Sequence, residues 1–176
     1  MNAMIEVDIL IVQEIELKYL SKIKKLLYLL AVNGPGAPNV SKLAAEIQTS
    51  RATVMNYIKY LADARLINMI YNPGDATPKK PAKVMLHNTN LVYSIYPVKV
   101  ADQDVLETFI ANALWKDHRV DKGGKGLSFL VDDSIQIRVC AENGRFKNNP
   151  EVYYVMHRRE LGRGNEIPLW LFGFLY

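Results

Sequence analysis

The sequence predicts an α+β protein, in which a helical head and a basic β-hairpin precede a small α/β module. Two observations predict this order. Between residues 17 and 61 apolar side chains recur at steps of three and four, which is the period of amphipathic helices. Beyond residue 126 the period shortens to two, which is the period of strands. A length of 176 residues allows one large domain or two small ones.

Composition excludes several classes of protein. Hydrophobic residues make up 49% and charged residues 23%, which is typical of globular rather than disordered or fibrous chains. The longest uncharged apolar stretch, residues 167–176, has half the roughly 20 residues that a membrane-spanning helix needs. No export signal begins the chain, so we expect a cytoplasmic protein with no membrane partner. One cysteine, Cys140, and three scattered histidines predict neither a disulfide scaffold nor a metal site.

The first predicted helix begins at Leu17. Glycine accepts the left-handed conformation that ends helices and proline cannot continue one, so residues 33–36, Asn-Gly-Pro-Gly, predict its end. Four apolar positions define its buried side: Leu20, Ile23, Leu27 and Leu30.

Two further helices follow, separated by a tight turn. Ser41 can begin a helix of about two turns that ends at Gln48, and Ser50 can cap the next one. A short helix, a tight turn and a longer helix with an apolar stripe form a helix-turn-helix arrangement, here preceded by another helix. The stripe of the third helix consists of Val54, Tyr57, Ile58 and Leu61.

A basic hairpin completes this first domain. Residues 66–70 predict a strand, residues 72–75 a turn, and residues 83–86 a returning strand. Lys79 and Lys80 lie between the two strands. Helices followed by a basic hairpin predict a winged helix over residues 5–87.

The positive charge is concentrated in the first half of the chain. Residues 1–100 carry 12 lysines and arginines against 7 acidic residues, whereas residues 101–176 carry 10 against 11. A polyanion would therefore bind the first half. The alternative is a solvated lysine face that binds nothing.

Duplex DNA is the partner that a winged helix suggests. The third helix would enter the major groove, and the hairpin would contact the backbone. Arginine and asparagine can pair with base edges, whereas lysine binds phosphate. A winged helix that only connects domains, or contacts proteins, is the alternative. The candidate DNA contacts are Arg51, Asn56, Lys59, Tyr60, Lys79, Lys80 and Lys83.

A second domain is predicted over residues 88–176. Residues 102–114 predict a helix with one apolar side, which would back a small sheet. Residues 127–131 and 134–140 predict paired strands, and residues 152–157 a third. We interpret Asp132-Asp133 as the hairpin turn rather than as a metal-binding pair, because adjacent residues at a strand end diverge.

The last ten residues, 167–176, are strongly apolar. Each such side chain contributes roughly 1.5–3 kcal/mol when fully buried. The segment therefore either docks into the core of its own chain, which we favour, or forms an interface with a second copy or an ATPase domain.

Four runs of sequence carry a resemblance to a known family: residues 83–93, 106–109, 128–132 and 164–176. Together they resemble the C-terminal region of a bacterial AAA+-type ATPase family, most of all its members from Bacteroides-like bacteria. The resemblance spans residues 5–176. It implies a nucleotide-binding domain, then a winged helix, then a domain similar in fold to restriction-endonuclease-like nucleases.

The chain departs from the family pattern at its nucleotide site. Residues 123–126, Gly-Gly-Lys-Gly, lack the spacing of a phosphate-binding loop. The resemblance therefore implies ATP and magnesium only for a domain ahead of this chain, and no cofactor within it. Either this is the C-terminal part of a longer protein, or its gene encodes a fragment that lost the motor.

The nuclease positions of the family are altered too. The resemblance implies an aspartate, a glutamate and a lysine that hold a divalent cation and position the attacking water. Here the corresponding residues are Ser128, Arg138 and Glu142, so the charges are lost or reversed. We expect no catalytic residue in this domain. Three functions stay open: DNA binding, assembly with or regulation of an ATPase without DNA binding, and, least favoured, metal-dependent nuclease activity.

Overall fold

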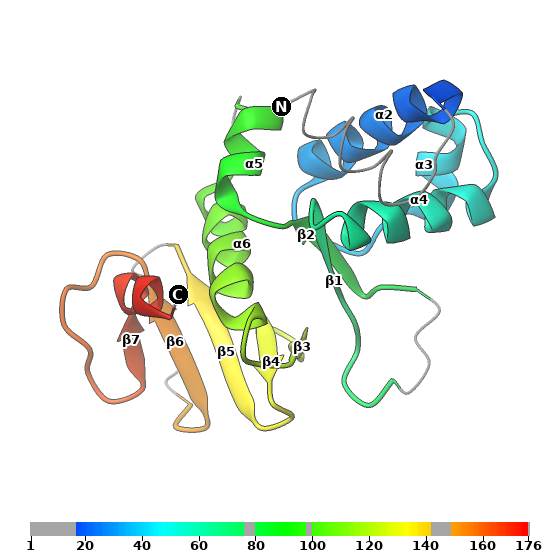
Figure 1. The fold of residues 1–176 in the computed structure, drawn as a ribbon. Helices are drawn as coiled ribbons and strands as arrows, with labels where there is room; N and C mark the ends of the chain where they lie inside the picture. The colour runs from blue at the N-terminus through cyan, green and yellow to red at the C-terminus, as the bar shows by residue number, and fades with distance from the viewer. Residues whose placement is uncertain (1–16, 76–79, 98–99, 142–148, 176) are drawn as a thin grey trace. The chain divides into compact units, whose positions relative to one another are not determined.

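The computed structural model describes residues 17–75, 80–97, 100–141 and 149–175, and it has the mixed α+β fold that the sequence predicts (Figure 1). Within these ranges no helix is both long and apolar enough to cross a membrane. The elements are α2 (Leu17–Asn33), α3 (Val40–Glu46), α4 (Arg51–Asp63), β1 (Ile67–Ile70), β2 (Lys83–Leu86), α5 (Thr89–Ile95), α6 (Asp102–Trp115), β3 (Val120–Lys122), β4 (Phe129–Val131), β5 (Ile135–Cys140), β6 (Val152–Met156), β7 (Glu166–Pro168) and the 3-10 helix η1 (Leu169–Phe174).

The described residues form two compact units. The first comprises residues 17–69, 80–97 and 100, and the second comprises residues 70–75, 101–141 and 149–175. Helix α5 belongs to the first unit, because Val92 is buried in that unit's core. The predicted domains, 5–87 and 88–176, stay a prediction. Residues 5–16 of the first domain lie outside the described residues.

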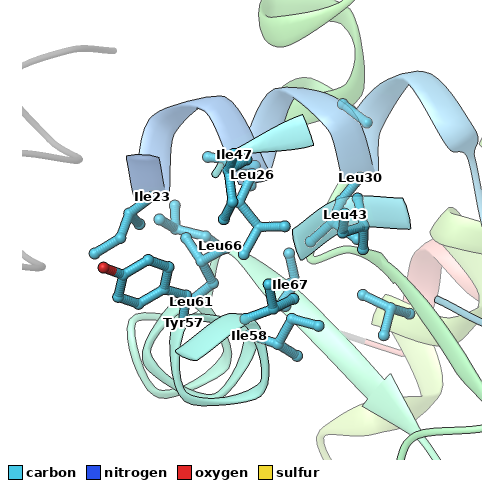
Figure 2. Packing of buried hydrophobic residues seen from close by; sticks show 14 of the residues in the cluster. Ile23, Leu26, Leu30, Leu43, Ile47, Tyr57, Ile58, Leu61, Leu66 and Ile67 are labelled. Carbon is cyan, nitrogen blue, oxygen red and sulfur yellow. The ribbon is translucent and has the colours of Figure 1, made fainter. Parts of the chain in front are cut away.

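The core of the first unit lies between α2 and α4. The apolar stripes predicted for the two helices are buried and pack against each other, with α3 and β2 alongside (Figure 2). Each fully buried leucine or isoleucine contributes roughly 1.5–3 kcal/mol. The side chains with almost no exposed surface include Ile23, Leu26, Val54, Ile58 and Leu61.

The two helix starts in this unit differ in how well the sequence predicts them. Ser50 caps α4 as predicted, since its Oγ accepts the N–H of Thr53 at 3.0 Å. The prediction that Ser41 begins α3 is wrong. Asn39 caps that helix instead, because its Oδ1 accepts the N–H of Lys42 at 3.1 Å. Both residues are common caps, so sequence alone does not separate positions two residues apart.

The turn between α3 and α4 is held by the backbone and by two lysines. Gln48 adopts a left-handed conformation with φ of 51°, which lets Thr49 N–H donate to Ala44 O at 2.9 Å. From α2, Lys22 Nζ donates to Gln48 O at 2.7 Å, and Lys25 Nζ donates to Glu46 O at 2.6 Å. These bonds satisfy carbonyls at the end of α3, where cations also favour the helix dipole.

A small sheet follows the helices. Strands β1 and β2 pair, and Gly36 adds one further position. Its N–H donates to Val84 O at 3.2 Å, and Val84 N–H donates back at 2.8 Å. The predicted turn at residues 72–75 is present, with Gly74 at φ of 78°. The loop between the strands begins within the second unit, where Lys122 N–H donates to Tyr71 O at 2.8 Å.

The second unit is a five-stranded sheet in the order β3-β4-β5-β6-β7, and α6 lies along one of its faces (Figure 1). Strands β3, β4 and β5 are antiparallel, whereas β6 runs parallel to β5 and β7 parallel to β6. The predicted strand pair and third strand are confirmed as β4, β5 and β6. The first and last strands, β3 and β7, were not predicted.

Asp132 and Asp133 form the hairpin turn between β4 and β5, as predicted. Both have positive φ, 49° and 59°, and Ser134 N–H closes the turn on Val131 O at 3.2 Å. The Asp132 carboxylate accepts His118 Nδ1–H at 2.7 Å and Arg119 N–H at 2.9 Å. The hydrogen bond from His118, and then that from Arg119, hold the pKa of Asp132 below its usual value.

The apolar C-terminal segment docks only in part. Phe172 is buried, and η1 packs on α6. A 3-10 helix has three residues per turn, so a single ridge of η1 faces the core. Within residues 167–175 the segment therefore docks on its own chain through Pro168 and Phe172 rather than along its whole length. Four large apolar side chains stay exposed: Trp170, Leu171, Phe174 and Leu175.

Gln48→Gly should stabilise the first unit by about 1 kcal/mol, because glycine adopts the left-handed conformation without the steric cost of a Cβ. Urea unfolding followed by far-UV circular dichroism measures this change. The neighbouring Ala45→Gly, in the exposed part of α3, is the matched control and should destabilise by about 1 kcal/mol. Equal destabilisation by both substitutions would contradict the conformation described for Gln48.

Candidate functional site

The outer face of α4 carries two of the predicted DNA contacts, Asn56 and Lys59, and a third, Arg51, is exposed at the start of the helix. Arg51, Asn56 and Lys59 are all exposed, while the opposite stripe of the helix is buried. Residues three and four apart share a helix face. The centre of the outward face is therefore a row of exposed residues, three of them polar and the first one small. That row consists of Ala52, Asn56, Lys59 and Asp63.

The other predicted contacts are placed less uniformly. Tyr60 is half-buried at the edge of the core, with its ring centroid 6.3 Å from that of Tyr57. Lys80 is exposed. Lys83 is half-buried on β2 and already engaged in an interaction. Lys79 lies outside the described residues. The structure thus places Asn56 and Lys59 on one face of α4, with Arg51 exposed at its N-terminal end.

A buried polar pair joins β1 to the end of β2. His87 Nδ1 lies 2.7 Å from Asn68 Oδ1, and Asn68 is only 3% exposed. An amide oxygen can only accept, so Nδ1 carries the proton. Burial, and secondarily the charge of Arg65, lower the pKa of His87 below its usual value. The imidazole therefore stays neutral near pH 7. Its hydrogen bond to Asn68 links β1 to the end of β2.

A second polar cluster ties α6 to the sheet of the second unit. Ser128 Oγ–H donates to Glu107 Oε1 at 2.9 Å, and the same hydroxyl accepts Val139 N–H at 3.1 Å. Gln103 Nε2 donates to Glu107 Oε1 at 3.1 Å and to Val139 O at 2.9 Å. Gln103 Oε1 accepts Ala141 N–H at 3.2 Å. We name Gln103, Glu107 and Ser128 the α6–β4 network.

The sequence analysis singled out Ser128 but not its two partners. Gln103 and Glu107 are four residues apart and thus lie on the same face of α6. Polar residues at that spacing on the inner side of an apolar helix are the signal that could have revealed them. No local sequence motif marks these two residues, because the groups to which they hydrogen-bond lie far along the chain, in residues 128–141.

The altered nuclease positions do not form a metal centre in the described structure. Ser128 is 5% exposed, and its hydroxyl is used within the α6–β4 network. Arg138 lies on β5, where its backbone is in register with Tyr154 of β6. Glu142 lies outside the described residues. Among the residues with described positions, no three His, Cys, Asp or Glu side chains gather where they could hold a metal ion.

No protein-family model, curated protein or solved structure matches this chain. The outer face of α4 and the α6–β4 network are therefore interpreted from their own chemistry.

Ser128→Ala should destabilise the second unit by about 1–3 kcal/mol, because it leaves the buried Val139 N–H without its acceptor and removes a donor from Glu107. Thermal unfolding followed by near-UV circular dichroism measures the loss. Ser134→Ala, in the exposed β4–β5 turn, removes a hydroxyl without burying an unpaired group and should change stability little. If the two variants unfolded alike, the α6–β4 network would not stabilise the unit as described.

Proposed function

We propose that the first unit is a winged helix that binds duplex DNA through the outer face of α4. Support comes from the order of its elements: α2, then α3 and α4 across a tight turn, then the hairpin of β1 and β2. The pairing of Gly36 with Val84 adds a strand-like position between α2 and α3. In this arrangement α4 is the helix that would enter the major groove.

The observation that carries the proposal is the joint exposure of Arg51, Asn56 and Lys59. An α-helix with its side chains is roughly 10–12 Å across, which fits the major groove of about 12 Å. Arginine and asparagine can each make two hydrogen bonds to a base edge, and lysine can neutralise a phosphate. The small Ala52 beside them lets the helix approach the groove closely.

The hairpin and the edge of α4 supply secondary contacts in this proposal. Lys80 is exposed and suited to a phosphate, as is Lys79 by its sequence position. Tyr60 and Lys83 are half-buried, so they would contribute through the hydroxyl and the ammonium at their tips. Asp63 lies on the same face as Lys59. Its carboxylate would repel a phosphate there and reduces the positive charge of this face.

For the second unit we propose a restriction-endonuclease-like fold that has lost its catalysis. Support comes from its mixed sheet, in which the antiparallel strands β3 to β5 and the parallel strand β6 follow helix α6. Ser128 lies where the resemblance implies an aspartate, and its hydroxyl donates a hydrogen bond to Glu107. In place of a glutamate, Arg138 would repel a divalent cation. The chain would then be the non-catalytic C-terminal portion of an AAA+-type ATPase, whose preceding domain binds ATP and magnesium.

A protein-binding or regulatory role without DNA is the second candidate, with an ATPase domain or a second copy as the partner. One observation favours it: Tyr28 and Val32 on α2 and Tyr93 on α5 are exposed, in two helices that contact each other. Large apolar side chains grouped on a surface are typical of protein interfaces. A stable dimer at micromolar concentration that does not bind DNA would support this candidate over the first.

Arg51→Ala/Lys59→Ala should weaken binding to a mixed-sequence duplex of about 20 base pairs at least about tenfold. Because Lys59 would neutralise a phosphate while Arg51 would pair with a base edge, the slope of log affinity against log salt should fall by about one. Fluorescence anisotropy between about 50 and 200 mM salt measures both quantities.

Lys116→Ala/Lys125→Ala is the matched control, since it removes the same charge from exposed positions of the second unit. It should leave the affinity nearly unchanged. Equal losses in the two double variants, or a wild-type affinity that does not fall with salt, would contradict binding by α4.

The purified protein should not cleave duplex or single-stranded DNA in the presence of magnesium or manganese. Gel analysis of a labelled plasmid and oligonucleotide tests this. The Asp132→Asn/Asp133→Asn variant is the control for contaminating nucleases. Metal-dependent cleavage that this variant lacks would overturn the proposal of an inactive nuclease fold.

A further inference from the structure

A surface of the second unit combines exposed aromatic rings with arginines. It consists of the loop 157–165, between β6 and β7, and of η1, and we name it the loop–η1 surface. Trp170 is 51% exposed and Phe174 is 77% exposed. Neither ring is needed to fill the core, because the buried Phe172 anchors η1.

The two parts of this surface are joined by a specific contact. Trp170 Nε1–H donates to Glu160 O at 3.2 Å, which fixes the indole beside the loop. The rings of Trp170 and Phe174 meet edge to face, with centroids 6.0 Å apart and planes at 80°. The loop is closed at its far end, where Arg163 N–H donates to Glu166 O at 3.1 Å. The rings are thus held in position before any ligand arrives.

The charge of the loop is positive, although residues 101–176 as a whole are not. Arg159 pairs with Glu166 at 3.1 Å and is largely neutralised. Arg158 and Arg163 are exposed, and neither side chain pairs with an acidic residue within the described ranges. The loop that holds Trp170 through Glu160 O therefore carries two exposed arginines without acidic partners among the described residues, against one exposed carboxylate, that of Glu160.

We propose that the loop–η1 surface binds single-stranded nucleic acid. Unpaired bases stack on aromatic side chains, and arginines donate hydrogen bonds to the phosphates between them. Because the rings are already fixed, stacking would cost little ordering of the protein. The site is separate from α4 and does not depend on duplex binding by that helix.

Other occupants fit this chemistry less well. A duplex hides the faces of its bases, so it could use the arginines but not the rings. A second copy, docked through a two-fold axis, would bring the same arginines face to face. A membrane would require a longer amphipathic segment than the six residues of η1, since interfacial helices often reach 20–30 residues.

Tryptophan fluorescence tests the proposal directly. The chain has two tryptophans, so the full-length Trp115→Phe variant leaves Trp170 as the only one. Adding an oligothymidylate of about 15 nucleotides should quench its emission in a saturable manner, because a base stacked on the indole quenches it. In this background Phe174→Ala should weaken binding about tenfold.

Two further variants separate the contributions. Arg158→Ala/Arg163→Ala should weaken binding and reduce the salt slope by about 1.4, the value for two phosphate contacts on a single strand. Tyr93→Ala removes an aromatic ring that is 54% exposed in the first unit and should change nothing. Arg51→Ala/Lys59→Ala should also leave the quenching intact, so failure at α4 and failure here are distinguishable.

Several outcomes would overturn the proposal. One is the absence of quenching, and another is an unchanged affinity in Phe174→Ala. A blue shift of Trp170 with vesicles containing phosphatidylserine, but not with the oligonucleotide, would identify a membrane surface instead. A dimer that Phe174→Ala dissociates, without oligonucleotide binding, would identify a contact between copies.

Discussion

The burial of one stripe of α4 against α2 is the constraint on which the first unit depends. Ile58 and Leu61 fill the space beneath α2, so the helix can present only its opposite face outward. Lys22 and Lys25 of α2 hold the carbonyls that end α3 and thereby fix the turn that leads into α4. Lys22 and Lys25, which add to the positive charge of the first half of the chain, therefore stabilise the fold. The charge available to a polyanion is correspondingly smaller and more localised than the net charge suggests.

The second unit uses polar groups differently on its two parts. Near α6 they are paired inward: Glu107 and Ser128 satisfy each other and fasten the helix to the sheet. On the loop–η1 surface they face water, beside rings that the core does not need. A hydroxyl and a carboxylate that are already hydrogen-bonded have little capacity left for a cation, whereas exposed arginines and aromatic rings are available to a ligand. The polar residues that stabilise the second unit are thus different from those that we propose to bind a ligand.

Local signals in the sequence predicted local structure well. The Ser50 cap, the stripe of α4 and the Asp132-Asp133 turn are each determined by residues within a few positions of one another. What the sequence did not predict depends on distant partners. Asn39 rather than Ser41 caps α3, and which of the two does so depends on where the helix begins in the folded chain. Strands as short as β7 exist because a neighbour pairs with them. The outward face of α4 follows from its own pattern, but the partners of Glu107 do not.

The central claim, that α4 contacts DNA with its outer face, is tested most directly by residue-resolved NMR. On titration of the labelled protein with a short duplex at low salt, the amide signals of Ala52, Asn56 and Lys59 should shift most. The buried Val54 and Leu61 should shift less, because they face the core. Shifts confined to the second unit, or none along α4 at saturating duplex, would contradict the account.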